Sequence, residues 1–159
     1  MDVSHGIIDV LKRSASALKD NGVPYCLAGG LAVSMLSRPR ATEDVDLIVL
    51  VAEQERPFLE SLIKRTFNVF QVRDIMRFST VSIWRFIIND TAAEFVVLDL
   101  ILAERAEYLK AIQNALILDI DGVNVQVIAP DDLIEVKKLS GRPIDLMDIQ
   151  ALQEEFGLF

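Results

Sequence analysis

The chain has 159 residues, a formal net charge of −8 and 52% hydrophobic residues, a composition that excludes intrinsic disorder and a length that suits one domain. We expect neither a membrane span nor a signal peptide, because no apolar run approaches roughly 20 residues and the start lacks a basic, then apolar, stretch. The single cysteine fits a reducing cytoplasm, the single histidine argues against multi-histidine zinc sites, and 24 acidic against 16 basic residues argue against a broad nucleic-acid-binding face.

Hydrophobic periodicity and turn residues predict alternating helices and strands. In chain order, we expect a helix over 7–18, a strand over 25–28, a helix over 31–37, a strand over 45–51, a helix over 53–67, strands over 69–72, 81–88 and 94–102, a helix over 104–114, a hairpin of strands over 116–120 and 123–127, and helices over 130–140 and 143–156. No repeat or linker divides the chain. This pattern predicts one α+β (α/β-like) domain over residues 1–159, a mixed sheet flanked by helices, with 130–159 as its C-terminal helical portion.

Some expectations concern single residues. Asp121 and Gly122 separate the last two strands, and such a pair favours a type I′ turn, which needs positive φ at both positions. We expect Phe58 on the buried side of the helix over 53–67. We also expect Leu146 and Phe156, with Ile149 and Leu152 between them, on the buried side of the last helix.

Asp44 and Asp46 begin the strand that continues into Leu47-Ile48-Val49. Residues two apart on a strand share a face, so the two carboxylates point the same way and raise each other's pKa unless a cation lies between them. Oxygen ligands without nearby Cys or His select Mg²⁺ or Mn²⁺. The alternative is a pair of acids on a solvent-exposed sheet face.

Gly29 and Gly30 lie between a predicted strand and a predicted helix. Glycines there let the backbone approach a ligand, and the helix offers unpaired N–H groups to phosphate. The alternative is a tight strand–helix turn. A third acid for a two-metal site is Asp99, inside the apolar stretch 96–102. The alternative for Asp99 is an ion pair with an Arg or Lys.

Two blocks of sequence, 25–33 and 38–47, resemble the signature of the nucleotidyltransferase superfamily (polymerase-β-like fold). The signature is a Gly-Gly or Gly-Ser turn, Asp-x-Asp about a dozen residues later, and one Asp on a later strand. The R-x-T-x-D-x-D form, together with Lys137 and the segment 141–149, resembles the short bacterial proteins related to nucleotidyltransferase-like toxins of the AbiEii type. Here Gly30 replaces the serine of many members, so backbone N–H groups would have to bind the phosphate.

The resemblance implies a role for each matching residue. Asp44, Asp46 and Asp99 would bind the metals, and Asp99 would help to deprotonate an acceptor hydroxyl. The nucleotide-binding residues that it implies are Gly29, Gly30, Arg40, Thr42 and Lys137. Arg142, Asp145 and Asp148 would either form a charged cluster beside the site or cap a helix and pair with each other.

Two hypotheses follow. The first is an enzyme that moves a nucleoside monophosphate from an NTP to a hydroxyl of a protein, a tRNA or a small molecule and releases pyrophosphate, with Mg²⁺ or Mn²⁺, as part of a toxin–antitoxin or phage-defence system. The second is a nucleotide-binding regulatory or antitoxin-like protein with little or no turnover. The short chain favours a homodimer or a partner chain that completes the substrate pocket.

Overall fold

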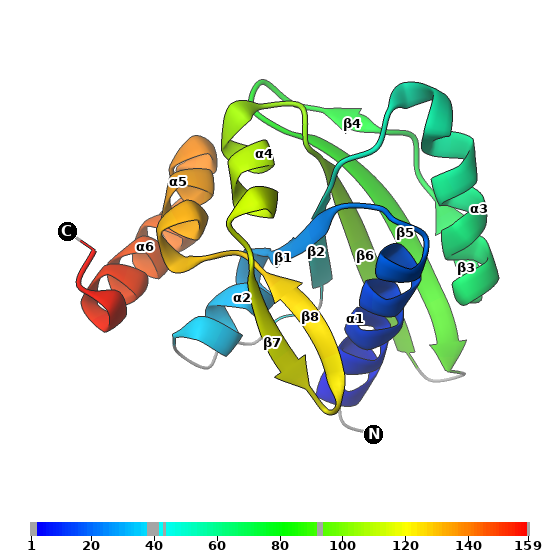
Figure 1. Ribbon diagram of the computed structural model, residues 1–159, viewed down its shortest axis with the longest axis horizontal. Coiled ribbons are helices and arrows are strands. Elements are labelled where there is room, and N and C mark those ends of the chain that lie inside the picture. Colours follow the sequence, from blue (N-terminus) through cyan, green and yellow to red (C-terminus); the bar gives the residue numbers. More distant parts are fainter. Residues whose placement is uncertain (1–2, 38–41, 43, 92–93, 159) are drawn as a thin grey trace.

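The computed structural model describes residues 3–37, 42, 44–91 and 94–158 as one mixed sheet with helices around it (Figure 1). In chain order, the elements are α1 (Val3–Asp20), β1 (Tyr25–Ala28), α2 (Gly29–Leu36), β2 (Asp44–Val49), the 3₁₀ turn η1 (Glu53–Glu55), α3 (Arg56–Thr66), β3 (Val69–Val72), β4 (Met76–Arg77), β5 (Ser82–Thr91), β6 (Glu94–Leu102), α4 (Ala106–Gln113), β7 (Leu116–Ile120), β8 (Val123–Val127), α5 (Pro130–Ser140) and α6 (Pro143–Phe156). None of the helices in these described segments is long and apolar enough to cross a membrane.

The sheet has the order β3-β5-β6-β2-β1-β8-β7, with β4 paired to β5. At its centre β2 runs parallel to β6 and antiparallel to β1, and β1 runs parallel to β8. This confirms the predicted mixed sheet. The central strands are apolar, and β2 is buried along its length except at Asp44 and Asp46.

One face of the sheet is covered by α1, which packs against β2, β6, β8 and α3. Val45, Leu47 and Val49 of β2 are fully buried. Because strand side chains alternate, Asp44 and Asp46 point to the opposite face from these residues. Figure 1 shows α1 and α3 on the same side of the molecule and α5 and α6 together at its far end. The acids therefore lie on the face that α1 does not cover.

Most predicted elements are confirmed, although several of their ends differ by a few residues. η1 replaces the first turn of the helix over 53–67, because Pro57 occupies the first turn of α3 and donates no backbone hydrogen bond. The two-residue strand β4 was too short to leave a sequence pattern. α2 starts at Gly29, earlier than the predicted 31–37. The hairpin turn is confirmed by positive φ at Asp121 (49°) and Gly122 (86°).

The prediction that three hydrophobic residues lie on buried helix faces is wrong: Phe58, Leu146 and Phe156 are 45%, 58% and 41% exposed. Phe58 lies to one side of the buried stripe that Leu59 and Ile63 form. The inward positions at the start of α6 are taken by acidic residues, which turns Leu146 outward, and Phe156 lies in the last turn of that helix. An apolar pattern alone misses a helix whose buried face is partly charged.

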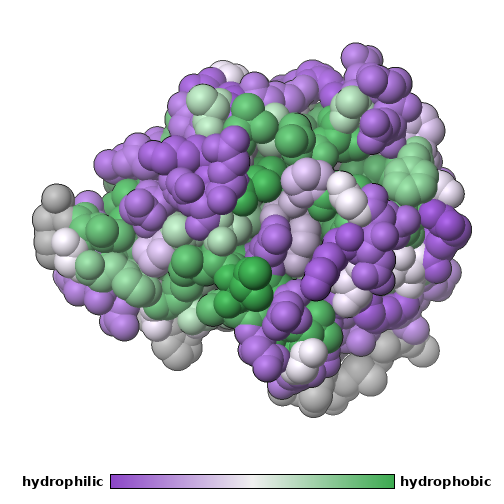
Figure 2. Space-filling view, in the orientation of Figure 1, coloured by the Kyte–Doolittle hydropathy of each residue, from purple (hydrophilic) through white to green (hydrophobic). Residues whose placement is uncertain are grey.

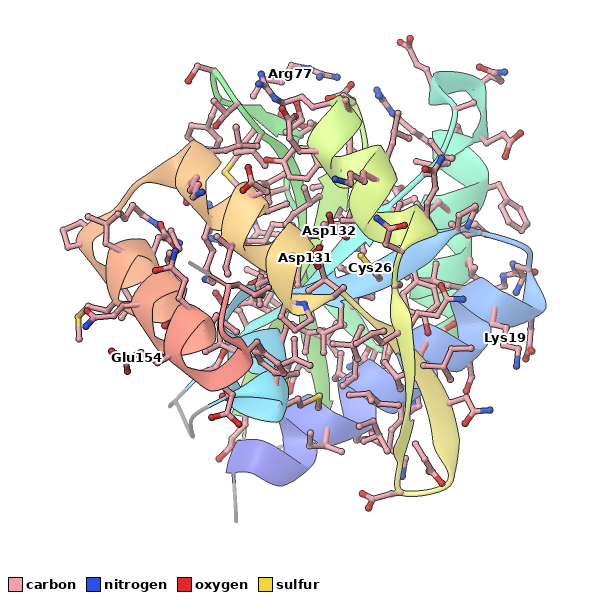
Figure 3. The ribbon with its side chains drawn as sticks, turned by 60° about the vertical axis from the view of Figure 1, so that its left-hand side comes forward. Lys19, Cys26, Arg77, Asp131, Asp132 and Glu154 are labelled. Carbon is pink, nitrogen blue, oxygen red and sulfur yellow. The ribbon has the colours of Figure 1, made fainter. Side chains whose placement is uncertain are left out.

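Two residue environments near β1, β8 and β7 differ in exposure. Burial, reinforced by the nearby charge of Asp132, raises the pKa of the Cys26 thiol to about 12, and Figure 3 shows Asp132 of α5 beside Cys26 of β1. This thiol is buried and inert. Leu116 and Ile117 of β7 are exposed, and Figure 2 shows hydrophobic residues gathered where β7 lies in Figure 1.

The two C-terminal helices are joined by buried charges. Lys137 Nζ of α5 lies 3.0 Å from Asp148 Oδ2 and 3.5 Å from Asp145 Oδ1 of α6, and all three residues are buried. Arg142 caps α6 by donating from its backbone N–H and its Nε to Asp145. Burial opposes ionisation of Asp145, but hydrogen bonds from Arg142 and Ser140 hold its pKa at about 2. Arg142 thus caps α6 and pairs with Asp145, as the second of the two interpretations of this cluster expects, and Asp148 pairs with Lys137.

We predict that Lys137→Met lowers the free energy of unfolding by about 3–5 kcal/mol, because it leaves two buried carboxylates without their shared ammonium group. The matched control is Lys138→Met, whose exposed ammonium pairs with exposed Glu135 and whose loss should cost less than about 1 kcal/mol. Urea unfolding of both variants measures the difference, and equal losses would show that the buried cluster contributes no more than a surface pair.

Candidate active site

Three carboxylates come together on the face of β2 and β6 that α1 does not cover, which we call the open face. In the β2–β6 ladder the Cα partner of Asp46 is Asp99, and Asp44 lies opposite Val97. Directly paired residues of neighbouring strands point to the same side of the sheet. Asp99 is 4% exposed, whereas Asp44 and Asp46 are partly exposed. The fold therefore places the predicted third acid beside the Asp-x-Asp pair.

Asp99 already has a cationic partner. Arg85 Nε and Nη2 each donate to a different oxygen of Asp99, both over 2.8 Å. Arg85 is the Cα partner of Asp99 in the β5–β6 ladder, so the sheet itself aligns the two groups. The hydrogen bond to Asp99 raises the pKa of Arg85. The ion-pair alternative for Asp99 is thus confirmed, and it does not remove Asp99 from the acid cluster.

The donor chemistry of the cluster suits a hard divalent cation, but the side-chain arrangement is not that of a closed metal site. Within the described residues, no group of three or more His, Cys, Asp or Glu side chains is arranged to hold a metal ion. Asp44 and Asp46 share one face of β2 and fit Mg²⁺ or Mn²⁺ as oxygen donors. Arg85 uses one lone pair on each oxygen of Asp99, so Asp99 would serve as a third ligand through the lone pairs that remain.

Gly29 lies against the acids. Its φ is +67°, and a Cβ built on it would lie 2.0 Å from Asp46 Oδ2, far inside van der Waals contact. Only glycine meets both requirements at this position. Gly29 and Gly30 form the first turn of α2, and the preceding residue, Ala28, supplies no side-chain cap to its N–H groups. The backbone donors at the start of α2 thus lie beside the carboxylate of Asp46.

Of the other predicted nucleotide-binding residues, the structure describes Thr42 and Lys137. The Thr42 hydroxyl donates to the backbone carbonyl of Asp44 over 3.2 Å, which supports the start of the acidic strand. Lys137 is buried between α5 and α6, and its charge also acts on Asp46. Arg40 lies outside the described residues. The roles of all three toward a nucleotide stay predictions.

Asp46 is the most perturbed carboxyl of the cluster. Burial, and then the negative charges of Asp99 and Asp44, raise its pKa to about 7, against the opposing charges of Lys137 and Arg85. A group in this position exchanges its proton near neutral pH and gains from any added cation.

Arg85 is the functional candidate that the sequence prediction missed. The available signal was a lone arginine inside the strand over 81–88, matched by a lone aspartate inside the neighbouring apolar strand. Opposite charges isolated in two adjacent apolar strands indicate a cross-strand pair.

We predict that Gly29→Ala destabilises the protein by clearly more than Gly22→Ala. Both glycines have a φ of +67°, but a Cβ at Gly22 meets nothing within 4 Å, so that control carries only the left-handed backbone cost of about 1–2 kcal/mol. The added methyl at Gly29 must also displace the Asp46 carboxylate. Urea unfolding measures both changes, and equal losses would show that the contact with Asp46 is unimportant.

We predict that Asp46 makes the metal-free protein less stable as pH rises. Its pKa of about 7 lies above the value of about 4 in an unfolded chain, so the folded state binds the extra proton between these values and its advantage is lost toward pH 7. Asp46→Asn should therefore gain stability relative to the wild type on going from about pH 5 to about pH 8 in EDTA. Glu154→Gln, an exposed acid of α6, is the control. A stability difference independent of pH for Asp46→Asn would contradict the prediction.

Comparison with known proteins gives structural matches only: no family model and no curated protein matches the sequence. An antigenic nucleotidyltransferase-like protein from Paracoccidioides brasiliensis aligns with a TM-score of 0.61 and 23% identity over 91% of this chain and 74% of its own. ANT(2″)-Ia in complex with adenylyl-2″-tobramycin aligns with a TM-score of 0.64 and 16% identity, over 96% of this chain and 90% of its own.

A third match is the lincosamide antibiotic adenylyltransferase LnuA with lincomycin bound, with a TM-score of 0.52 and 13% identity over 95% of this chain and 94% of its own. At these identities the likeness establishes the fold. The structural neighbours are nucleotidyltransferase-like proteins, and this chain has the nucleotidyltransferase fold.

Proposed function

We propose that the protein is a metal-dependent nucleotidyltransferase that moves a nucleoside monophosphate from an NTP to an acceptor hydroxyl. The observation that carries this proposal is the placement of Asp44, Asp46 and Asp99 on one open sheet face, directly against the glycine turn that begins α2. The fold shared with two antibiotic adenylyltransferases supports it.

In this proposal the triphosphate lies at the start of α2. The backbone N–H groups of Gly29 and Gly30 bind phosphate oxygens, aided by the positive end of the helix dipole. Arg40 and Lys137 add positive charge, and Thr42 keeps the acidic strand in place. Asp44, Asp46 and Asp99 hold the metal ions, which neutralise the charge that develops on the transferring phosphate.

The reaction is an in-line displacement. The acceptor hydroxyl oxygen bonds to the α-phosphorus while the bond to the bridging oxygen of the β-phosphate breaks, and pyrophosphate leaves with the electron pair. Asp99 accepts the hydroxyl proton on a lone pair that Arg85 does not use. Arg85 keeps the carboxylate in place through its two hydrogen bonds.

For the acceptor, the neighbours favour a small molecule, since one of those structures contains adenylyl-2″-tobramycin and another lincomycin. A protein hydroxyl and a tRNA end are the other two acceptors that this chemistry serves. We further propose a role in a toxin–antitoxin or phage-defence system, which the resemblance to AbiEii-related proteins supports, and a cytoplasmic location, which the single free cysteine supports. We further propose that a second copy or a partner chain contributes to acceptor recognition.

The second candidate is a nucleotide-binding regulatory or antitoxin-like protein without efficient turnover. The bidentate Arg85–Asp99 pair favours it, because the positive charge of Arg85 beside the third acid opposes a metal ion there. In that case the site binds nucleotide and metal, and no pyrophosphate is released.

We predict that Asp44→Asn and Asp46→Asn each lower nucleotidyl transfer by at least about 100-fold, because the cation that neutralises the transferring phosphate loses a ligand. The assay incubates the protein with α-phosphate-labelled NTPs, Mg²⁺ and cell extract, and follows label uptake and pyrophosphate release. Glu154→Gln is the control and should retain full activity. Calorimetry of NTP binding separates the two candidates: binding without pyrophosphate release favours the regulatory protein, and full activity in both Asn variants would contradict the assigned site.

A further inference from the structure

We propose a second ligand site, for a phosphate-bearing small molecule, in a groove on the opposite side of the sheet from the three acids. The groove lies between α3 and the segment that joins β3 to β4, with β5 as its floor, and has a volume of about 560 Å³. That volume lies within the range of small-molecule sites, roughly 300–1,000 Å³. This proposal does not depend on the proposed transfer reaction.

The alternation of β5 separates the groove from the acid cluster. Trp84 lines the groove, and its neighbour Arg85 binds Asp99 on the open face. Adjacent strand residues point to opposite faces. A molecule in the groove therefore does not touch Asp44, Asp46 or Asp99.

Positive charge converges on the groove in a chain whose net charge is −8. Arg56 and Lys64 of α3 line one wall, and Arg73, just after β3, lines the other. Two acids, Glu60 and Asp74, also line it, and Glu60 is engaged by Lys64 at 3.1 Å. The local charge is therefore positive, in contrast to the molecule as a whole.

Some hydrogen-bond donors of the arginines that line this groove have no partner among the described residues. Arg56 Nε is buried and, among the described residues, has no hydrogen-bond partner, although Arg56 Nη2 lies 3.6 Å from Glu104. A buried donor left without a partner is unfavourable. No ion pair of the exposed Arg73 side chain is present in the described structure. Arg73 on one wall and Arg56 on the other thus have guanidinium donors that the described residues do not use.

These features select the ligand chemistry. Guanidinium forks match phosphate oxygens in pairs, and the negative charge of a phosphate monoester is complementary to Arg56 and Arg73. Val72, Ile75 and Trp84 supply an apolar surface for the rest of the molecule. We therefore assign the groove to a phosphate monoester with an apolar or aromatic body, in preference to a free carboxylate.

Trp84 provides a direct readout, because it is the single tryptophan of the protein and lines the groove. The experiment follows tryptophan emission of the full chain in EDTA during separate titrations with AMP, inorganic phosphate, pyrophosphate and citrate. We expect a saturable change with AMP and a weaker one with inorganic phosphate. Binding of inorganic phosphate or pyrophosphate as tight as that of AMP would overturn the apolar-body part of the assignment, and citrate binding as tight as AMP would overturn the phosphate part.

The variants locate the site. Arg73→Met should weaken AMP binding about tenfold or more, because a charge-assisted contact is lost. Arg65→Met is the matched control: Arg65 is exposed on the same helix, α3, donates to the backbone of Ser61 and does not line the groove. Asp46→Asn should bind AMP with unchanged affinity, which separates this site from the acid cluster. No saturable change in emission, or equal binding by Arg73→Met and the wild type, would overturn the proposal.

Discussion

Repulsion among Asp44, Asp46 and Asp99 is the electrostatic constraint around which the centre of this fold is arranged. Parallel pairing of β2 and β6 forces Asp46 and Asp99 to the same side at neighbouring Cα positions. The chain offsets this repulsion from several directions: Arg85 on β5, Lys137 on α5 and the N-terminus of α2 all lie near the cluster. The raised pKa of Asp46 indicates that this compensation is incomplete, which leaves the face receptive to a further cation.

The compensation also explains why parts of the chain far apart in sequence depend on one another. Lys137 acts on Asp46 while it is itself held by Asp145 and Asp148 of the last helix. The C-terminal helices are therefore not an appendage, because the buried ion pairs that join them also position a charge for the sheet centre. A buried lysine with two carboxylates costs desolvation energy, and its retention is consistent with a positioning role beyond stability.

How far the sequence predicts this molecule depends on how local each feature is. Tyr25–Ala28, the hairpin around Asp121 and Gly122, and the helix Pro143–Phe156 were predicted to within a residue, because turn residues and periodicity mark them locally. The meeting of Asp46 with Asp99 was inferred from the need of a buried acid for a partner. The Arg85–Asp99 pair left a signal, an isolated arginine and an isolated aspartate in adjacent apolar strands, but its bidentate geometry depends on the strand register. The clash that excludes a side chain at Gly29 depends on a positive φ and on the position of Asp46, and these leave no pattern in the sequence.

β5 links the two sites of this molecule, since it carries Arg85 toward the acids and Trp84 toward the groove. A ligand in the groove influences the acid cluster only if it favours one of two positions of this strand or of Arg85. The Arg85–Asp99 pair is the contact through which such a shift would reach the acids, because Arg85 Nε and Nη2 each donate to a different oxygen of Asp99. A displacement of β5 would weaken this pair, because two parallel hydrogen bonds depend on the alignment of both groups.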